Sequence, residues 1–116
     1  MIGPETGFVV INWVANPFRG DKFEEGWAFA AAQVVHYGAT AWAFVRSKDD
    51  PLSFMQFAAF ENKLDFERYW YSEEIAAARV RVAGWYQVPL LPIWYRVVDA
   101  GVLSETIPEP DPEPAA

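Results

Sequence analysis

A short polar turn in the middle of the chain, residues 48–51, most strongly limits the folds that this sequence can adopt. Before it, residues 40–47 alternate small with large side chains, and after it residues 53–61 are rich in phenylalanine. Two strand-like segments joined by so short a turn predict an antiparallel hairpin. Two more segments rich in β-branched and aromatic residues, 8–15 and 93–98, supply further strands. The sequence therefore predicts four strands, two of them paired in a central hairpin.

One helical segment precedes this hairpin and another follows it. Apolar residues recur at steps of three and four over residues 23–34, and we expect Asp21 to begin this helix and Gly38 to end it. Asn62 and Ser72 are expected to begin the helical turns after the hairpin. The order β-α-β-β-α-β is the split β-α-β pattern of ferredoxin-like α+β domains. Both helices then lie on one face of an antiparallel sheet, and we expect a second copy of the chain to cover the other face.

The composition of the 116 residues limits the size of the protein and its partners. With 53% hydrophobic and 17% aromatic residues, the chain is expected to pack one domain and to leave some rings in a pocket or an interface. A formal net charge of −7 argues against nucleic acid and membrane surfaces as partners. One histidine, no cysteine and no glycine-rich phosphate loop predict neither a metal nor a cofactor. Without a visible signal peptide or membrane span, a cytoplasmic location is expected.

The composition of the chain changes at about residue 103. Residues 1–103 hold all the predicted strands and helices and are expected to form a single domain. Residues 104–116 contain four acidic residues, no basic residue and a run with proline at every second position. Such a segment has too little apolar surface to pack, so we expect an acidic, proline-rich tail that is extended and solvated.

Three stretches form a pattern: Phe-Glu-Asn at residues 60–62, Asp-Phe-Glu-Arg-Tyr-Trp-Tyr-Ser-Glu at residues 65–73, and His-Tyr-Gly-Ala at residues 36–39. This pattern resembles the antibiotic biosynthesis monooxygenase (ABM) superfamily over about residues 8–98, and it implies a dimeric α/β barrel of ferredoxin-like domains. Oxygenases of that superfamily use neither metal nor flavin. Their electron-rich aromatic substrate, bound between sheet and helices, reduces oxygen through its own carbanion. Haem-degrading relatives need a histidine where this chain has Arg79, so haem degradation is not expected.

Two polar residues, Asn12 and Gln56, lie among apolar positions of the predicted strands. The resemblance implies an asparagine of the first strand, Asn12, as a polar group that holds the substrate. Because strand side chains alternate, Gln56 shares a side with Phe54 and Phe60. Asn12 and Gln56 are therefore the candidate catalytic residues, which would orient a substrate or a bound water. The alternative is that they tie the sheet to a loop or to a second copy. The expected substrate pocket consists of Phe54, Phe60, Trp70 and Arg79.

Two ionisable side chains, those of His36 and Arg79, are further candidates beside this pair. His36 is the one acid–base candidate near neutral pH, but it lies in the last turn of a predicted helix, where the helix dipole alone favours it. Arg79 can point inward to pair with an anionic ligand, or it can form a salt bridge at the surface or an interface.

Two functions remain open at this point. The first is a cofactor-independent monooxygenase or related enzyme that acts on a small aromatic or polyketide-like molecule, and it requires a cavity large enough for a tricyclic ligand. The second is a non-catalytic dimeric binding or structural module, and it predicts a cleft filled by the protein's own aromatic side chains.

Overall fold

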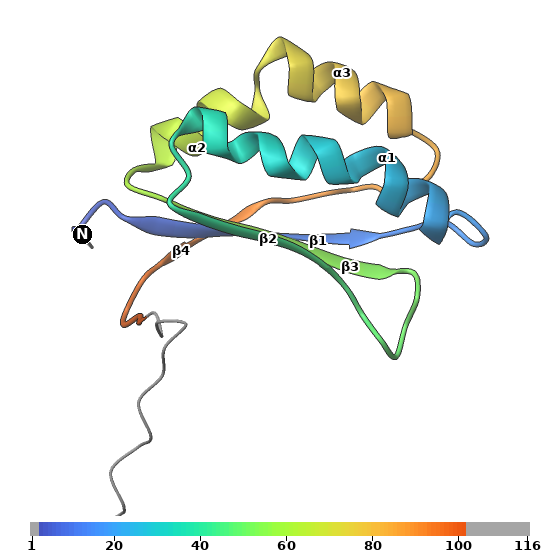
Figure 1. Cartoon of the computed structure of the whole chain (residues 1–116), viewed down its shortest axis with the longest axis horizontal. Coiled ribbons are helices and arrows are strands. Elements are labelled where there is room, and N and C mark those ends of the chain that lie inside the picture. Colours follow the sequence, from blue (N-terminus) through green and yellow to red (C-terminus); the bar gives the residue numbers. More distant parts are fainter. Residues whose placement is uncertain (1–2, 102–116) are drawn as a thin grey trace, which may run out of the picture.

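The fold is a four-stranded antiparallel sheet with helices on one of its faces (Figure 1). A computed structural model describes residues 3–101. The strands are ordered β2-β3-β1-β4, so the first strand lies inside the sheet. In chain order the elements are β1 (Gly7–Val14), α1 (Gly20–Ala32), the 3₁₀-helix η1 (Gln33–Tyr37), β2 (Ala41–Arg46), β3 (Ser53–Phe60), α2 (Lys63–Trp70), α3 (Glu73–Val82) and β4 (Ile93–Arg96). The predicted α+β order is confirmed, with its second helix divided in two.

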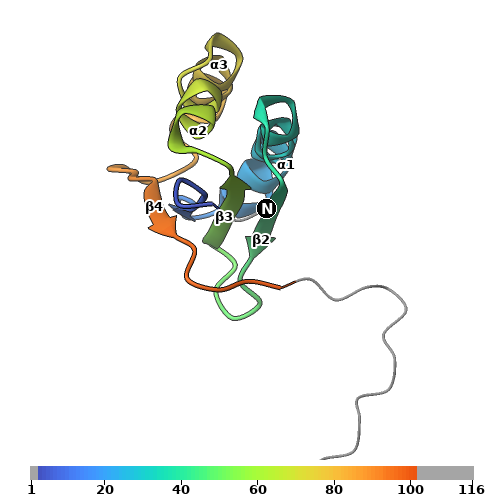
Figure 2. The same ribbon diagram turned by 90° about the vertical axis from the view of Figure 1, so that its left-hand side faces the viewer.

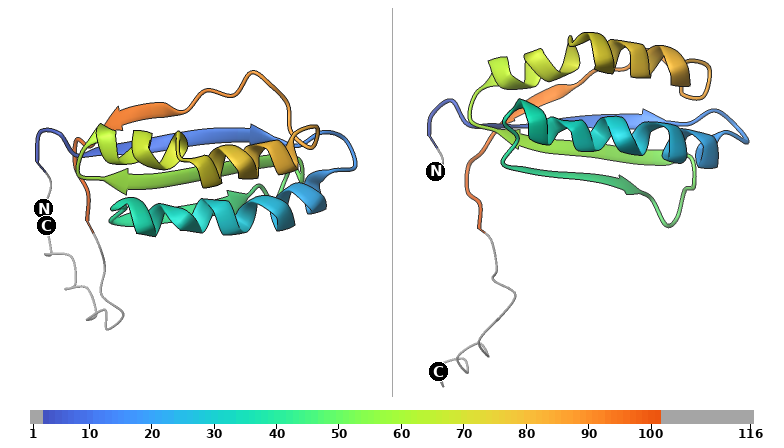
Figure 3. Two further views of the ribbon diagram at one scale, coloured as in Figure 1. Left: turned by 90° about the horizontal axis from the view of Figure 1, so that it is seen from above. Right: turned by 45° about the horizontal axis from the view of Figure 1, so that its top comes forward.

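The helices of the described residues form one layer, which the end-on view separates clearly from the sheet (Figure 2). Seen from above, α1 and α3 lie beside each other, and they also make the most extensive contact between helices (Figure 3). α1 packs over β2, and α2 packs over β3. Among residues 3–101, no helix covers the opposite face of the sheet, which we call the open face.

Three of the four expected helix ends are confirmed. Gly38 ends the first helical segment with a left-handed φ of 93°. The side chains of Asn62 and Ser72 each accept a hydrogen bond from the backbone N–H three residues further on, at 3.0 and 3.3 Å. The expected role of Asp21 is wrong: it lies inside the first turn of α1 and accepts a hydrogen bond from Arg46 of β2 at 2.8 Å. A carboxylate in that position ties the start of the helix to the sheet edge.

The pairing of β1 with β3 decides which side chains face the helices. Ile11 lies opposite Gln56, and Asn12 lies opposite Met55. Paired residues of an antiparallel ladder project from the same face of the sheet. Ile11 and Trp13 are fully buried beneath the helices. Gln56 therefore faces the helices, and Asn12 faces the open side.

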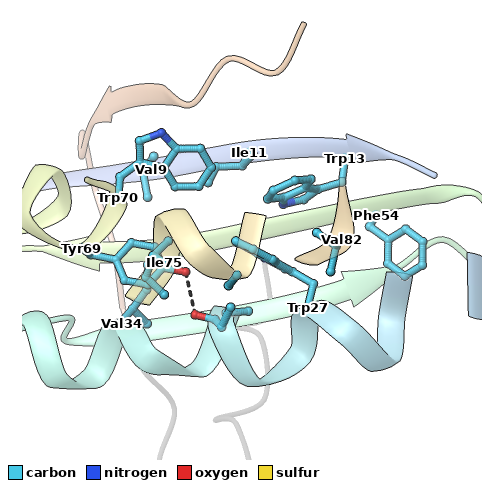
Figure 4. Packing of buried hydrophobic residues seen from close by; sticks show 14 of the residues in the cluster. Val9, Ile11, Trp13, Trp27, Val34, Phe54, Tyr69, Trp70, Ile75 and Val82 are labelled. Carbon is cyan, nitrogen blue, oxygen red and sulfur yellow. Dashed lines mark hydrogen bonds between the residues drawn. The ribbon is translucent and has the colours of Figure 1, made fainter. Parts of the chain in front are cut away.

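Aromatic side chains fill the layer between sheet and helices (Figure 4). Trp13 of β1 and Trp27 of α1 lie with their ring centres 4.7 Å apart, and both are fully buried. Phe23 of α1 and Tyr69 of α2 are fully buried as well. This layer is the hydrophobic core of the domain.

Two further expectations concern a membrane-spanning helix and the C-terminal tail. Among residues 3–101, no helix has the length and apolar character needed to cross a membrane. The predicted tail, residues 104–116, lies outside the described residues.

Candidate functional site

One buried amide, that of Gln56 on β3, joins the sheet to the helices. Its Oε1 accepts hydrogen bonds from the indole N–H groups of Trp13 at 3.1 Å and Trp27 at 2.8 Å. Its Nε2 donates to the hydroxyl of Tyr69 at 3.1 Å. That hydroxyl donates in turn to the backbone carbonyl of Ala30 at 2.7 Å, the bond drawn in Figure 4. β1, β3, α1 and α2 thus meet in one polar cluster, which we call the Gln56 network (Gln56, Trp13, Trp27 and Tyr69).

The oxygen of the Gln56 amide is fully used inside the core. Gln56 is 2% exposed, and both lone pairs of its Oε1 are used by indole groups. Burial raises the pKa of the Tyr69 phenol, so this hydroxyl stays a neutral donor. Every buried polar side-chain atom within residues 3–101 has a hydrogen-bond partner. A ligand can bond to the Gln56 amide oxygen only by breaking one of its two hydrogen bonds, and in this structure the amide ties the sheet to the helices.

Asn12 lies on the opposite face of the sheet from Gln56. Its side chain is exposed on the open face, beside Met55 of β3. The two candidate catalytic residues, Asn12 and Gln56, are therefore not brought together on one side of the sheet in the single chain. The physical reason is the register between β1 and β3, which pairs Gln56 with Ile11 instead.

The four residues expected to form a substrate pocket all lie on the helix side of the sheet. Phe54, Phe60 and Trp70 are buried in the core. The Arg79 guanidinium lies 4.2 Å from the centre of the Trp70 ring and donates a hydrogen bond to the Trp70 carbonyl oxygen at 2.8 Å. The structure brings these four residues into one layer. The guanidinium of Arg79, however, makes a cation–π contact with Trp70 and does not point to an open ligand site.

Trp70 begins a stack of rings that runs to the edge of the core. The ring centre of Phe66 lies 6.0 Å from that of Trp70, with an angle of 26° between the ring planes. It lies 6.4 Å from the ring centre of Trp94, with an angle of 24°. Trp94 of β4 lies across Gly7 of β1, where an added Cβ would overlap the indole ring. Trp94 was not among the expected site residues. The signal that could have found it is Gly7, a strand residue whose missing side chain leaves room for a ring from the neighbouring strand.

A hollow of about 640 Å³ opens beside Trp94, between α2 and β4. It lies at the mouth of the layer between sheet and helices, and its volume suits a small molecule. Its charged lining residues are Glu5, Lys63, Asp65, Arg68 and Arg96. Arg68 pairs with Asp65 at 3.3 Å, whereas Lys63 and Arg96 form no ion pair within the described residues. This space, the Trp94 hollow, combines an aromatic wall with two unpaired cations.

A second hollow, of about 680 Å³, lies on the open face of the sheet. The sheet contributes Phe8, Ala41, Ala59 and Tyr95 to its lining, and residues 97–101 after β4 form its other side. This hollow belongs to the uncovered sheet face and not to the helix layer.

His36 lies in the last turn of η1, and its side chain is exposed. A cationic side chain in that position is favoured by the partial negative charge at the end of a helix. The structure therefore places it apart from the buried Gln56 network and outside the lining of the Trp94 hollow.

Comparisons with known proteins bear on the fold. Comparing the sequence with family models and with curated proteins gave no match. Solved structures do match. A candidate antibiotic biosynthesis monooxygenase from Nitrosomonas europaea superposes with a TM-score of 0.74 at 17% identity, covering 84% of this chain and 95% of that one. SnoaB, a cofactor-independent oxygenase from Streptomyces nogalater, superposes with a TM-score of 0.71 at 13% identity, covering 83% of this chain and 96% of SnoaB. Rv0793 from Mycobacterium tuberculosis superposes with a TM-score of 0.72 at 11% identity, covering 84% of this chain and 99% of Rv0793.

Proposed function

We propose that this chain, which has the ferredoxin-like fold of the ABM proteins, is a homodimer that binds a small aromatic molecule. The Trp94 hollow is the observation that carries the proposal. A flat ring can stack on Trp94, and Lys63 and Arg96 favour a ligand whose ring hydroxyl has lost its proton. The proposed ligand is therefore an electron-rich, easily deprotonated aromatic compound.

The open sheet face supports the homodimer. The apolar side chains on the open side of β1 and β3 are Phe8, Val10, Val14, Met55, Phe57 and Ala59. At about 3.3 Å per residue and about 4.8 Å between strands, the sheet spans roughly 400 Å², and apolar side chains line most of its open side. The open side of the four strands carries no Asp, Glu, Lys or Arg. Two copies can therefore meet face to face without burying like charges.

The proposed reaction is a monooxygenation in which the substrate itself is the reductant. The deprotonated ligand transfers electrons to molecular oxygen. One oxygen atom enters the product, where a ring methylene becomes a carbonyl, and the other leaves as water with the two methylene hydrogens. In this proposal Lys63 and Arg96 stabilise the ligand anion, and Trp94 holds its ring in place. We assign the two cations no proton transfer.

Dithranol, a tricyclic hydroxylated anthrone, is the probe that tests this proposal. Calorimetric titration should show binding, with an affinity about tenfold lower for Trp94→Ala, because a lost ring stack costs roughly 1–1.5 kcal/mol. Trp42→Ala, which removes a half-exposed tryptophan of β2, should bind like the unchanged protein. Oxygen consumption above the uncatalysed rate would establish turnover. Equal binding by Trp94→Ala and the unchanged protein would remove the Trp94 hollow as the site, and no binding at all would remove the ligand class.

A non-catalytic dimeric module is the second candidate, and the Gln56 network favours it. The resemblance to ABM oxygenases implies a substrate between sheet and helices, but here the rings of Trp13, Trp27 and Tyr69 occupy that layer. A module of this kind would still dimerise. It would neither bind dithranol nor accelerate its oxidation.

A further inference from the structure

Asn12 is the one amide side chain among the open-side residues of the four strands. Its neighbours along β1 on that face are Val10 and Val14, and Met55 lies opposite it on β3. In the single chain the side chain is exposed, so water satisfies its amide. An amide in the middle of an apolar patch lowers the hydrophobic gain from covering that patch. Its presence there calls for a physical account.

Covering the face removes the water from Asn12. A buried amide without hydrogen bonds destabilises a complex, so a cover must supply both a donor and an acceptor. Val10, Val14 and Met55 offer neither. A second copy of the same chain offers both, because its own Asn12 amide carries N–H donors and a carbonyl acceptor, and a twofold axis that passes beside Asn12 brings the two amides together.

We propose that Asn12 fixes the register of the homodimer by pairing its amide with Asn12 of the second copy. The inference rests on the homodimer of the proposed function. Apart from the hydroxyl groups of Ser53 and Tyr95, the other open-side residues of the four strands are apolar and tolerate several sliding arrangements of two sheets. The arrangement that brings the two amides together lets them exchange two N–H···O bonds, so it satisfies both at once. A single polar pair in an apolar interface is known to select one register in this way, at some cost in stability.

A register-fixing role and a catalytic role for Asn12 predict different effects of the same substitution. A substrate-binding Asn12 would affect ligand affinity or turnover and leave self-association alone. An Asn12 that fixes the register changes the association of two copies. The two roles are therefore separated by measuring association directly, without any ligand.

The first test is Asn12→Asp, followed by sedimentation velocity at several pH values. Two apposed carboxylates repel at about pH 8, so the dimer should weaken by roughly a hundredfold or more. At about pH 5 burial and the like charge favour protonated carboxyls, and association should recover. Val80→Glu adds the same charge on α3, at a site that is 74% exposed, and should leave association unchanged. An Asn12→Asp dimer as tight as the unchanged one at about pH 8 would overturn the inference.

The second test uses Met55 as a reporter. The chain has two methionines, and Met55 lies directly opposite Asn12 in the sheet. With labelled methionine methyl groups, the unchanged dimer should give one Met55 signal in NMR spectra. Asn12→Val should stay dimeric and give several Met55 signals. A valine needs no hydrogen-bond partner, so more than one register of the two sheets is then stable. A single Met55 signal in that variant would overturn the inference.

The outcomes also separate this inference from the homodimer itself. A monomeric unchanged protein would remove both proposals. A dimer that is lost in Phe57→Glu but unaffected by either Asn12 substitution would keep the homodimer and remove the role of Asn12.

Discussion

The amide of Gln56 satisfies two indole N–H groups and one tyrosine hydroxyl inside the core. Each such group costs about 1–3 kcal/mol when it is buried without a partner. One glutamine therefore allows Trp13, Trp27 and Tyr69 to fill the layer with large rings and still leave no buried polar side-chain atom unpaired within the described residues. The same hydrogen bonds fix the orientations of these three rings, which makes the layer a rigid core.

Tyr69 carries a pH prediction at the scale of a single residue. Burial raises the pKa of its phenol in the folded protein above the ordinary value near 10. The folded state thus holds this proton more tightly than the unfolded chain does. The stabilisation from Tyr69 is fully present below about pH 10 and is lost as the pH rises further.

Urea unfolding at neutral pH and above about pH 10 measures this effect. The free energy of unfolding of the unchanged protein should fall more steeply with alkaline pH than that of Tyr69→Phe, which has no phenol to titrate. Tyr71→Phe removes a tyrosine that is 73% exposed and should follow the unchanged protein. Parallel curves for all three proteins would contradict the prediction.

At the scale of elements, the pairing of β4 with β1 shapes the Trp94 hollow. β4 has four residues and pairs with the first half of β1, with Gly7 opposite Arg96 and Val9 opposite Trp94. Because Gly7 has no side chain, the Trp94 ring lies across β1 and reaches Phe66 of α2. A strand at the sheet edge thereby contributes a wall of the hollow and a contact to the helix layer.

Gly7→Ala should disturb both of these contacts. The added methyl group would overlap the Trp94 ring, so the ring must leave its position. We expect the free energy of unfolding to fall by about 1–3 kcal/mol, as in other overpacked sites, and dithranol binding to weaken as well. Gly101→Ala is the matched control, because a Cβ there meets no atom within 4 Å. Thermal unfolding of the two variants measures the difference, and equal melting temperatures would contradict this account of Gly7.

At the scale of the whole molecule, the sheet has one face buried by helices and one face open to a partner. The formal net charge of −7 makes two copies repel at long range. The open side of the strands nevertheless carries no ionic side chain. Association is therefore expected to depend on the apolar face, and added salt should strengthen it by screening the net charge.

Phe57→Glu tests the sheet-face dimer. Phe57 stacks on Phe8 on the open face with ring centres 5.5 Å apart, so a glutamate there would place a charge inside the interface. We expect a monomer with unchanged secondary structure, measured by sedimentation equilibrium and circular dichroism. Val80→Glu adds the same charge on α3 at a site that is 74% exposed and should stay dimeric. If Phe57→Glu associates as strongly as Val80→Glu, the dimer uses another surface or none.

The sequence by itself determined the order of the elements and most of their ends. A hairpin follows from two strand-like segments and a short turn, and the ends of helices at Gly38, Asn62 and Ser72 follow from local backbone and capping chemistry. These features depend on residues a few positions apart. The chain order carries them directly, and the structure agrees with them.

Only the tertiary structure decided which side chains share a site. Alternation divides each strand into two sets, but it does not say which set of β1 matches which set of β3, a strand that begins only after a helix and another strand. The pairing of Ile11 with Gln56 sends Gln56 into the core and leaves Asn12 on the open face. The position of Trp94 across Gly7 likewise depends on β4 reaching β1 from the far end of the domain. Register and long-range packing are set by the whole chain folding together, because the free energy of burying one face depends on all the strands and helices that cover it.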